Sequence, residues 1–225
     1  MNLIINENYP GIIKEDNHYV FNGSIESENS IEFRFNKLLL VKGSIITDGL
    51  IIAEDSIEAE NSIIAEDLIR SKGSIIAKRW IKSGGSIAAE NSIEAGNSIE
   101  AEDWIKAEDS IKTEDWIKAG KWIEAKNTIE VETTIEAGGL IKAENWISQF
   151  NIKSKQIILI NGLEYKIWIW GGMIKVGCEQ HTAEEWKNFT DDEISDMETG
   201  ALNWWNKNKA MILSANNQPF TEPQI

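Results

Sequence analysis

Few side chains in this sequence combine the types and spacing that chemistry at a site requires. Cys178 and His181 lie three residues apart, which would suit a pair of metal ligands or a catalytic thiol beside its base. The one other histidine is His18, so a zinc site would lack ligands unless distant carboxylates joined it. We therefore expect His181 to cap or pack at a strand-to-helix junction. We expect Cys178 to close a strand as a small buried apolar residue.

No other motif in the chain points to catalysis. The sequence contains no nucleophile elbow, phosphate-binding loop or metalloprotease motif. A calcium-binding β-roll would need a glycine-rich repeat with aspartate at fixed spacing, and that repeat is missing as well. We expect a protein that is not an enzyme, with no catalytic residue, no metal site and no cofactor.

Tryptophan is a more informative residue type in this chain. Five of the 10 tryptophans stand immediately before an isoleucine of a recurring six-residue unit: Trp80, Trp104, Trp116, Trp122 and Trp146. A side chain at that position should face outward or lie at a corner. Because contiguous exposed aromatic side chains commonly mark protein-binding surfaces, these five are candidates for binding a partner. The alternative is that the terminal segments or another copy of the chain cover them.

Acidic pairs form a second set of candidates. The chain has 37 acidic and 22 basic side chains and a formal net charge of −15, which argues against direct binding to nucleic acid and permits a basic protein partner. Much of the negative charge should lie at the corners of the repeat. The partner-binding candidates there are Glu102, Asp103, Glu108, Asp109, Glu114 and Asp115.

Both sets of candidates belong to one internal repeat. Isoleucine occupies every sixth position from Ile45 to Ile147, eighteen times in all. This period fits neither a helix nor a plain strand, but it fits short strands joined by tight corners. The isoleucine and the residue two positions later, usually alanine, should face inward. The fourth residue after isoleucine is usually Asp, Asn or Gly, and we expect it to adopt positive φ.

The outward residues indicate how many repeats form one turn. At a step of eighteen residues all charged neighbours have opposite sign, in the columns Lys82-Glu100-Lys118-Glu136, Lys106-Glu124-Lys142 and Glu94-Lys112-Glu130. At a step of twelve, three of ten charged pairs would have the same sign. Like charges on neighbouring strands destabilise a sheet, so we predict a mainly β fold, a three-sided parallel β-helix with eighteen residues per coil. The same step places Trp104 and Trp122 in one column.

The repeat divides the chain into three parts. Residues 1–43 should form an N-terminal cap and first coil, residues 44–150 the hexapeptide-repeat β-helix, and residues 151–225 a C-terminal unit of strands and two or more helices. In the C-terminal unit we expect strands at 156–160, 164–170 and 173–178, with hairpin turns at Asn161-Gly162 and Gly171-Gly172.

Two capping boxes predict where helices begin. They start at Thr182 and Thr190, and the second helix either runs on or breaks at Gly200. We expect Trp204 and Trp205 to pack this unit onto the last coil, and residues 216–225 to form a loose tail.

Three features of the sequence indicate the cellular compartment. The chain has one cysteine, no basic and apolar leader, and no run of apolar residues long enough to cross a membrane. We therefore expect a cytoplasmic protein that does not engage a membrane.

Two parts of the chain resemble known families. Units such as Gly73-Ser74-Ile75-Ile76-Ala77 and Gly85-Ser86-Ile87-Ala88-Ala89 resemble the bactofilins, polymer-forming bacterial proteins whose β-helix is right-handed, and this favours a right-handed coil. The hexapeptide acyltransferases are also similar, but in them the small residue precedes the aliphatic one. The segment from Val176 to Phe189, with Ala201-Leu202-Asn203-Trp204-Trp205, looks like a short C-terminal module of phage and prophage proteins.

These observations leave three functions open. The first is a phage or prophage protein that binds a basic host partner as an inhibitor or decoy, for example a nucleic-acid-binding complex or a defence nuclease of the CRISPR type, in the host cytoplasm. The second is a bactofilin-like scaffold or homo-oligomer. The third is an acyltransferase-like enzyme that uses His181.

Overall fold

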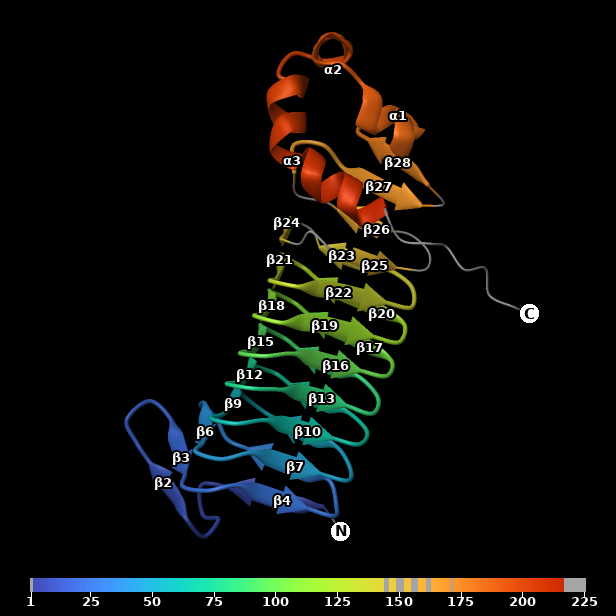
Figure 1. The fold of residues 1–225 in the computed structure, drawn as a ribbon. Helices are drawn as coiled ribbons and strands as arrows, with labels where there is room; N and C mark the ends of the chain where they lie inside the picture. The colour runs from blue at the N-terminus through green and yellow to red at the C-terminus, as the bar shows by residue number, and fades with distance from the viewer. Residues whose placement is uncertain are drawn as a thin grey trace, which may run out of the picture.

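The chain winds into a parallel β-helix with a small unit of strands and helices at its C-terminal end (Figure 1). The structure is a computed structural model, and it describes residues 2–143, 146–148, 152–154, 158–160, 163–170 and 172–216. Each strand of the repeat pairs with the strand one turn later, three repeat units along the chain, as Ile63 does with Ile81 and Ile75 with Ile93. The predicted three-sided β-helix is therefore confirmed.

Three sheets form its sides in the described part of the chain. The twelve-stranded sheet contains β1 (Leu3–Asn6), β5 (Ile31–Arg34), β8 (Ile51–Ala53), β11 (Ile69–Ser71), β14 (Ile87–Ala89), β17 (Trp104–Ala107), β20 (Trp122–Ala125), β23 (Ile141–Ala143), β26 (Ile158–Ile160), β27 (Ile167–Trp170), β28 (Met173–Val176) and β29 (Glu179–Thr182). The eight-stranded sheet contains β4 (Ile25–Ser27), β7 (Ile45–Thr47), β10 (Ile63–Ala65), β13 (Ile81–Ser83), β16 (Ile99–Ala101), β19 (Trp116–Ala119), β22 (Thr134–Ala137) and β25 (Ile152–Ser154). The nine-stranded sheet contains β2 (Ile12–Lys14), β3 (Tyr19–Phe21), β6 (Leu39–Val41), β9 (Ile57–Ala59), β12 (Ile75–Ala77), β15 (Ile93–Ala95), β18 (Ile111–Thr113), β21 (Thr128–Val131) and β24 (Trp146–Ser148).

Isoleucine builds the interior of the helix. All eighteen repeat isoleucines from Ile45 to Ile147 are buried, and the side chain two residues later is buried on nearly every strand of the repeat. Burying one isoleucine contributes about 1.5–3 kcal/mol relative to leaving it exposed. One large and one small inward side chain per strand therefore fill a narrow triangular core.

The outward charges stack as the sequence predicts. All seven predicted neighbours of opposite sign are paired in register, for example Lys82 with Glu100 and Lys112 with Glu130. Some pairs form ion pairs along the column, with the Lys142 amine 2.6 Å from a Glu124 carboxylate oxygen. Exposed pairs of this kind each add little, so the ladder contributes more to register than to stability.

The corners do not use positive φ, and that prediction is wrong. No described residue other than glycine has positive φ, and the described glycines that do, such as Gly172 and Gly200, lie outside the repeat corners. The corners turn with ordinary φ and stack on each other: the amide of Asn91 donates to the carbonyl of Gly73, one coil earlier, at 3.2 Å. Glycine is favoured where a neighbouring backbone comes close: a Cβ at Gly85, the fourth residue after Ile81, would collide with the carbonyl oxygen of Asp67.

The N-terminal coils are longer where the six-residue period is interrupted before Ile45. Ile25 pairs with Ile45 and Ile31 with Ile51, so these coils are two residues longer than the rest. The buried rings of Phe33 and Phe35 fill the additional space. Strand β2 folds back antiparallel onto β3 and covers one edge of the helix.

At the other end the parallel sheets run beyond residue 150. Ile135 pairs with Ile152 and Ile141 with Ile158 before the chain turns into the antiparallel strands β26 to β29. Trp170 pairs with Met173, so β27 and β28 form an antiparallel pair as predicted, while Gly171 of the predicted Gly171-Gly172 turn lies outside the described residues. The predicted turn at Asn161-Gly162 lies outside the described residues. Strand β29 was missed because Gly177 (φ +60°) and Cys178 form another tight turn.

Both capping boxes begin helices as predicted. Thr182 caps α1 (Ala183–Asn188) and Thr190 caps α2 (Asp191–Met197). The chain breaks at Gly200, with φ +90°, before α3 (Ala201–Asn216), which contacts β25 and β27. The described ring contacts of Trp204 and Trp205 are with Tyr165 and Trp186 inside the C-terminal unit, and their packing onto the last coil stays a prediction. Beyond Asn216 the predicted tail lies outside the described residues.

Candidate functional site

Trp104 and Trp122 form the one close pair among the described tryptophans of the repeat. They stand opposite each other on β17 and β20, with ring centroids 5.0 Å apart and planes inclined by 3°. The strand spacing of about 4.8 Å fixes this distance. Both rings are half-buried, and such a pair contributes about 0.5–1.5 kcal/mol beyond its burial. The eighteen-residue step therefore predicted this contact.

An apolar column continues on both sides of the pair. Leu140 follows one coil later and is 37% exposed, and Leu68 lies two coils earlier beyond the buried Ser86. Ala88 occupies an outward position that is charged in most later repeats. A shallow groove opens there between Arg70 and Trp104. This face thus combines an apolar column with a groove that basic and acidic side chains both line.

Trp80 and Trp116 belong to a different side of the helix. They precede the isoleucines of β13 and β19 in the eight-stranded sheet and are 44% and 37% exposed. Ser98 lies between them, one coil from each, and the Arg79 guanidinium lies 5.3 Å from the centroid of the Trp80 ring. Trp146 lies on β24 in the nine-stranded sheet, and its side chain is outside the described set. The five tryptophans therefore do not share one face.

The six acidic candidates occupy the three successive corners of one coil. Glu102 and Asp103 lie between β16 and β17, Glu108 and Asp109 between β17 and β18, and the third pair between β18 and β19. The three corners of one triangular coil point away from the helix axis in three different directions. The candidates therefore form a ring around the rod and not a single patch.

Two of these corners are largely compensated. The Lys121 amine lies 2.7 Å from an Asp103 carboxylate oxygen, and the Lys106 amine lies 2.9 Å from a Glu108 oxygen. The hydrogen bond from Lys106 lowers the pKa of the Glu108 carboxyl group. Hydrogen bonds from Asn127, first, and Ser92, second, lower the pKa of Asp109. Three of the four carboxylates at these two corners therefore have a basic or hydrogen-bonding neighbour, whereas the exposed Glu102 has no ion pair among the described residues.

The third corner is different. Glu114 and Asp115 are exposed, and within the described residues neither has an ion-pair partner. Glu132 lies one coil later at the same corner, is also exposed, and likewise has no ion pair in the part of the chain that is described. Trp116 follows Asp115 directly. We call these four residues the acidic corner.

The structure places Cys178 and His181 in different surroundings. Cys178 is exposed in the turn between β28 and β29, so the expectation that it closes a strand as a buried residue is wrong. The tight turn after Gly177 explains its exposure. His181 packs edge-on against Trp186 and Phe189, with centroids 5.3 Å and 4.9 Å away, which confirms a packing role at the junction with α1. Within the described residues, no group of three or more His, Cys, Asp and Glu side chains could hold a metal ion.

Two features of the surface escaped the sequence reasoning. Glu132 was missed because its corner partner is Thr133 and not a second acid, although its place exactly one coil after Glu114 could be read from the repeat. Outward isoleucines were also missed: Ile46 and Ile64 pair on the eight-stranded sheet and are half-buried. The N-terminal coils are therefore more apolar outside than the charged columns suggested.

Comparison with known proteins gives no relative for this chain. No family model, no curated protein and no solved structure matches it. Among the described residues, no helix is both long and apolar enough to cross a membrane. The structure thus defines a hexapeptide-repeat parallel β-helix, and the likenesses to the bactofilins and to a phage module rest on the sequence motifs alone.

Proposed function

We propose that this protein is a non-enzymatic binding protein whose acidic corner engages a basic surface on another protein. The observation that carries this proposal is the juxtaposition of three exposed carboxylates, without ion pairs among the described residues, with an exposed indole. Some carboxylates elsewhere on the rod are paired, as Glu60 is with both Lys42 and Lys78 at 3.1 Å. Others, such as Glu66 and Asp67, are exposed without an ion pair among the described residues, but no tryptophan follows them at their corner. The uncompensated charge of the acidic corner therefore lies where Trp116 can supply apolar contact area.

This combination suits both the rate and the strength of association. Uncompensated charge steers a partner of opposite sign and raises the association rate. An aromatic side chain that becomes buried on binding commonly supplies a large share of the affinity. Charge alone would attract any cation, and the indole adds the selectivity that a binding surface needs.

A decoy role is the specific form of the proposal. Corners repeat along the rod at about 4.8 Å per coil, so negative charge on a rigid rod can imitate the charge of duplex nucleic acid. The similarity of residues 176–205 to a phage and prophage module supports a host nucleic-acid-binding complex or defence nuclease as the target. Such a protein would act in the host cytoplasm.

The test starts from capture of bacterial lysate proteins on the immobilised chain. Each captured protein is then purified and titrated against the wild type and against a Glu114→Gln/Asp115→Asn variant. The matched control is Glu28→Gln/Asp48→Asn, which removes the same charge from exposed acids near the N-terminal end. We expect the corner variant to bind several-fold more weakly, the control to bind normally, and affinity to fall steeply with salt.

A further variant separates the indole from the charge. Trp116→Ser should weaken binding about 30-fold if the indole is a central contact, with little change in salt dependence. Equal effects of the corner and control variants, or binding that does not respond to salt, would refute the proposal. A partner that binds normally while duplex DNA is present in excess would refute the decoy form alone.

A scaffold is the second candidate, because of the N-terminal end. Strands β1 and β4 end their sheets there, and each pairs on one side only within the described residues. Open strand edges can pair with a second copy. At the C-terminal end, however, antiparallel strands and α3 cover the coil, which opposes head-to-tail growth. Sedimentation at high concentration separates the cases, because a discrete monomer or dimer excludes a polymer.

A further inference from the structure

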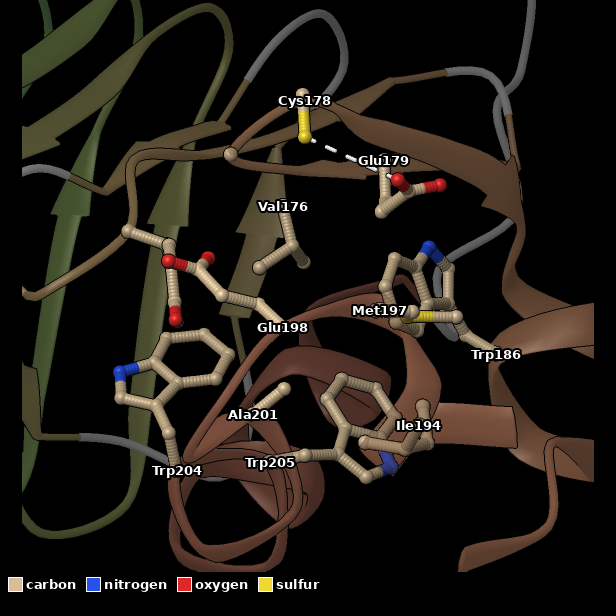
Figure 2. A pocket seen from close by; sticks show the side chains of 12 residues that line it. Val176, Cys178, Glu179, Trp186, Ile194, Met197, Glu198, Ala201, Trp204 and Trp205 are labelled. Carbon is tan, nitrogen blue, oxygen red and sulfur yellow. Dashed lines mark hydrogen bonds between the residues drawn. The ribbon is translucent and has the colours of Figure 1, made fainter. Parts of the chain in front are cut away.

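The C-terminal unit contains a small aromatic pocket away from the acidic corner. It lies between β28, the helix pair α1 and α2, and the start of α3, and Figure 2 shows its side chains. The described residues that line it are Tyr165, Val176, Gly177, Cys178, Glu179, Trp186, Ile194, Met197, Glu198, Ala201, Trp204 and Trp205. Its volume is about 70 Å³. A single water needs about 10–15 Å³ of space, so the pocket can hold a compact group of a few heavy atoms.

The pocket has an apolar floor and an acidic rim. Trp186 and Trp205 are 2% and 3% exposed and pack on each other, with ring centroids 4.8 Å apart. Tyr165 and Trp204 are half-buried and meet edge to face at 4.9 Å. The exposed Glu198 also lines the pocket, and Figure 2 draws its carboxylate among the lining side chains. The four aromatic rings of Tyr165, Trp186, Trp204 and Trp205 thus line the space.

The charge of the lining has one sign. Glu179 and Glu198 are both acidic, and none of the described lining residues is basic. Tyr165 anchors one of them: burial, first, and its hydrogen bond with Glu198, second, raise the pKa of the phenol. A phenol that stays protonated keeps the Glu198 carboxylate at the rim.

Such a lining selects an organic cation. Aromatic faces attract a positive charge by about 0.5–2 kcal/mol each, most strongly when the cation is desolvated, and cages of this type hold quaternary ammonium groups. The molecule already contains one such contact, since the Lys209 amine lies 5.8 Å from the centroid of the Trp205 ring without lining the pocket. A small inorganic cation would have to give up strongly held water to enter this apolar space, so it is disfavoured relative to an organic cation with apolar surface.

We propose that this pocket binds an organic cation with a head group of about four heavy atoms, such as a trimethylammonium or a guanidinium. The aromatic rings contact its apolar surface, and Glu198 offsets its charge at the opening. The site is separate from the acidic corner, so this proposal stands or falls independently of the proposed function.

The decisive measurement uses the wild-type protein alone. Choline and its neutral isostere 3,3-dimethylbutan-1-ol have nearly the same shape, so titration of each, followed by NMR and tryptophan fluorescence, isolates the effect of charge. We expect choline to bind at least tenfold more tightly, in line with about 1.4 kcal/mol or more from charge recognition. Equal affinity for the two compounds, or no binding of choline, would overturn the proposal.

Variants then assign the binding to this pocket. Glu198→Gln should weaken choline binding several-fold, and Trp204→Leu should weaken it further, whereas Glu184→Gln, an exposed acid of α1 outside the lining, should have no effect. Choline binding that is unchanged in Glu198→Gln would place the cation elsewhere and contradict the assignment. Titration with N-acetyl-arginine amide beside choline distinguishes a protein side chain from a free quaternary amine as the source of the cation.

Discussion

Reversing one charge in an outward column should destabilise the whole β-helix. Glu124 stands between Lys106 and Lys142 in the twelve-stranded sheet, and the Lys142 amine is 2.6 Å from its carboxylate. The substitution Glu124→Lys would place three lysines on consecutive coils about 4.8 Å apart. Two attractive Lys–Glu pairs would become two repulsive Lys–Lys pairs.

The size of the loss follows from that geometry. Each cross-strand pair of opposite charge contributes about 0.2–1 kcal/mol, and a like pair costs a similar amount. Reversing two pairs should therefore lower the free energy of unfolding by about 1–4 kcal/mol. Coulomb's law in water gives about 0.9 kcal/mol for one pair at this spacing, so the change from attraction to repulsion in two pairs is about 3.5 kcal/mol, at the upper end of that range. Urea unfolding followed by circular dichroism measures the change.

Glu114→Lys is the matched control because it changes net charge by the same amount. Its neighbours at the corner, one coil to either side, are Gly96 and Glu132, so it should leave stability unchanged or raise it slightly. In 1 M salt, where the Debye length is about 3 Å, the loss in Glu124→Lys should shrink. Equal losses in the two variants, or a loss that salt does not reduce, would refute the eighteen-residue register as the source of the effect.

Two other substitutions test the core and the helix caps. Ile105→Ala should lower the free energy of unfolding by about 2–5 kcal/mol because its side chain is fully buried, whereas Ile13→Ala, 46% exposed, should change it little in the same urea experiment. A small loss in Ile105→Ala would contradict a tightly packed interior. Hydrogen bonds from the backbone and side chain of Thr190 lower the pKa of Glu193 below its ordinary 4.5. Its stabilising effect is therefore complete above that value and is lost as the pH falls through the lowered pKa, so Glu193→Gln should flatten the acid-induced loss of helix seen by circular dichroism below pH 4.5. An unchanged acid profile would show that this cap does not titrate with folding.

Local patterns predicted most of the fold. The isoleucine period and the alternating charges depend on the geometry of neighbouring strands. Each position of the unit recurs in many repeats, so single exceptions do not obscure the pattern. The two patterns together predicted the three sides, the register and the Trp104–Trp122 contact. The right-handed coil stays a prediction from resemblance. Positive φ at the corners failed because Asp, Asn and Gly there serve close stacking between coils, which a single unit does not reveal.

The candidate sites depended on information that the repeat does not contain. Whether an acid is free depends on the next coil, as Asp103 with Lys121 and Asp115 without an ion pair among the described residues demonstrate. The aromatic pocket combines Tyr165, Trp186 and Trp204, which are well separated in the sequence and meet only when antiparallel strands and three helices pack together. No period in the sequence links them.

Alternation of charge along the columns also restricts how this rod can change its length. Removing one coil, residues 100–117, would set Lys82 against Lys118 and Glu94 against Glu130, like against like on two of the three faces. Removing two coils would instead set Lys82 against Glu136 and restore attraction. Genetic gain or loss of repeats should therefore be tolerated best in steps of two coils. An even change in the number of coils keeps opposite charges adjacent, whereas an odd change places like charges next to each other.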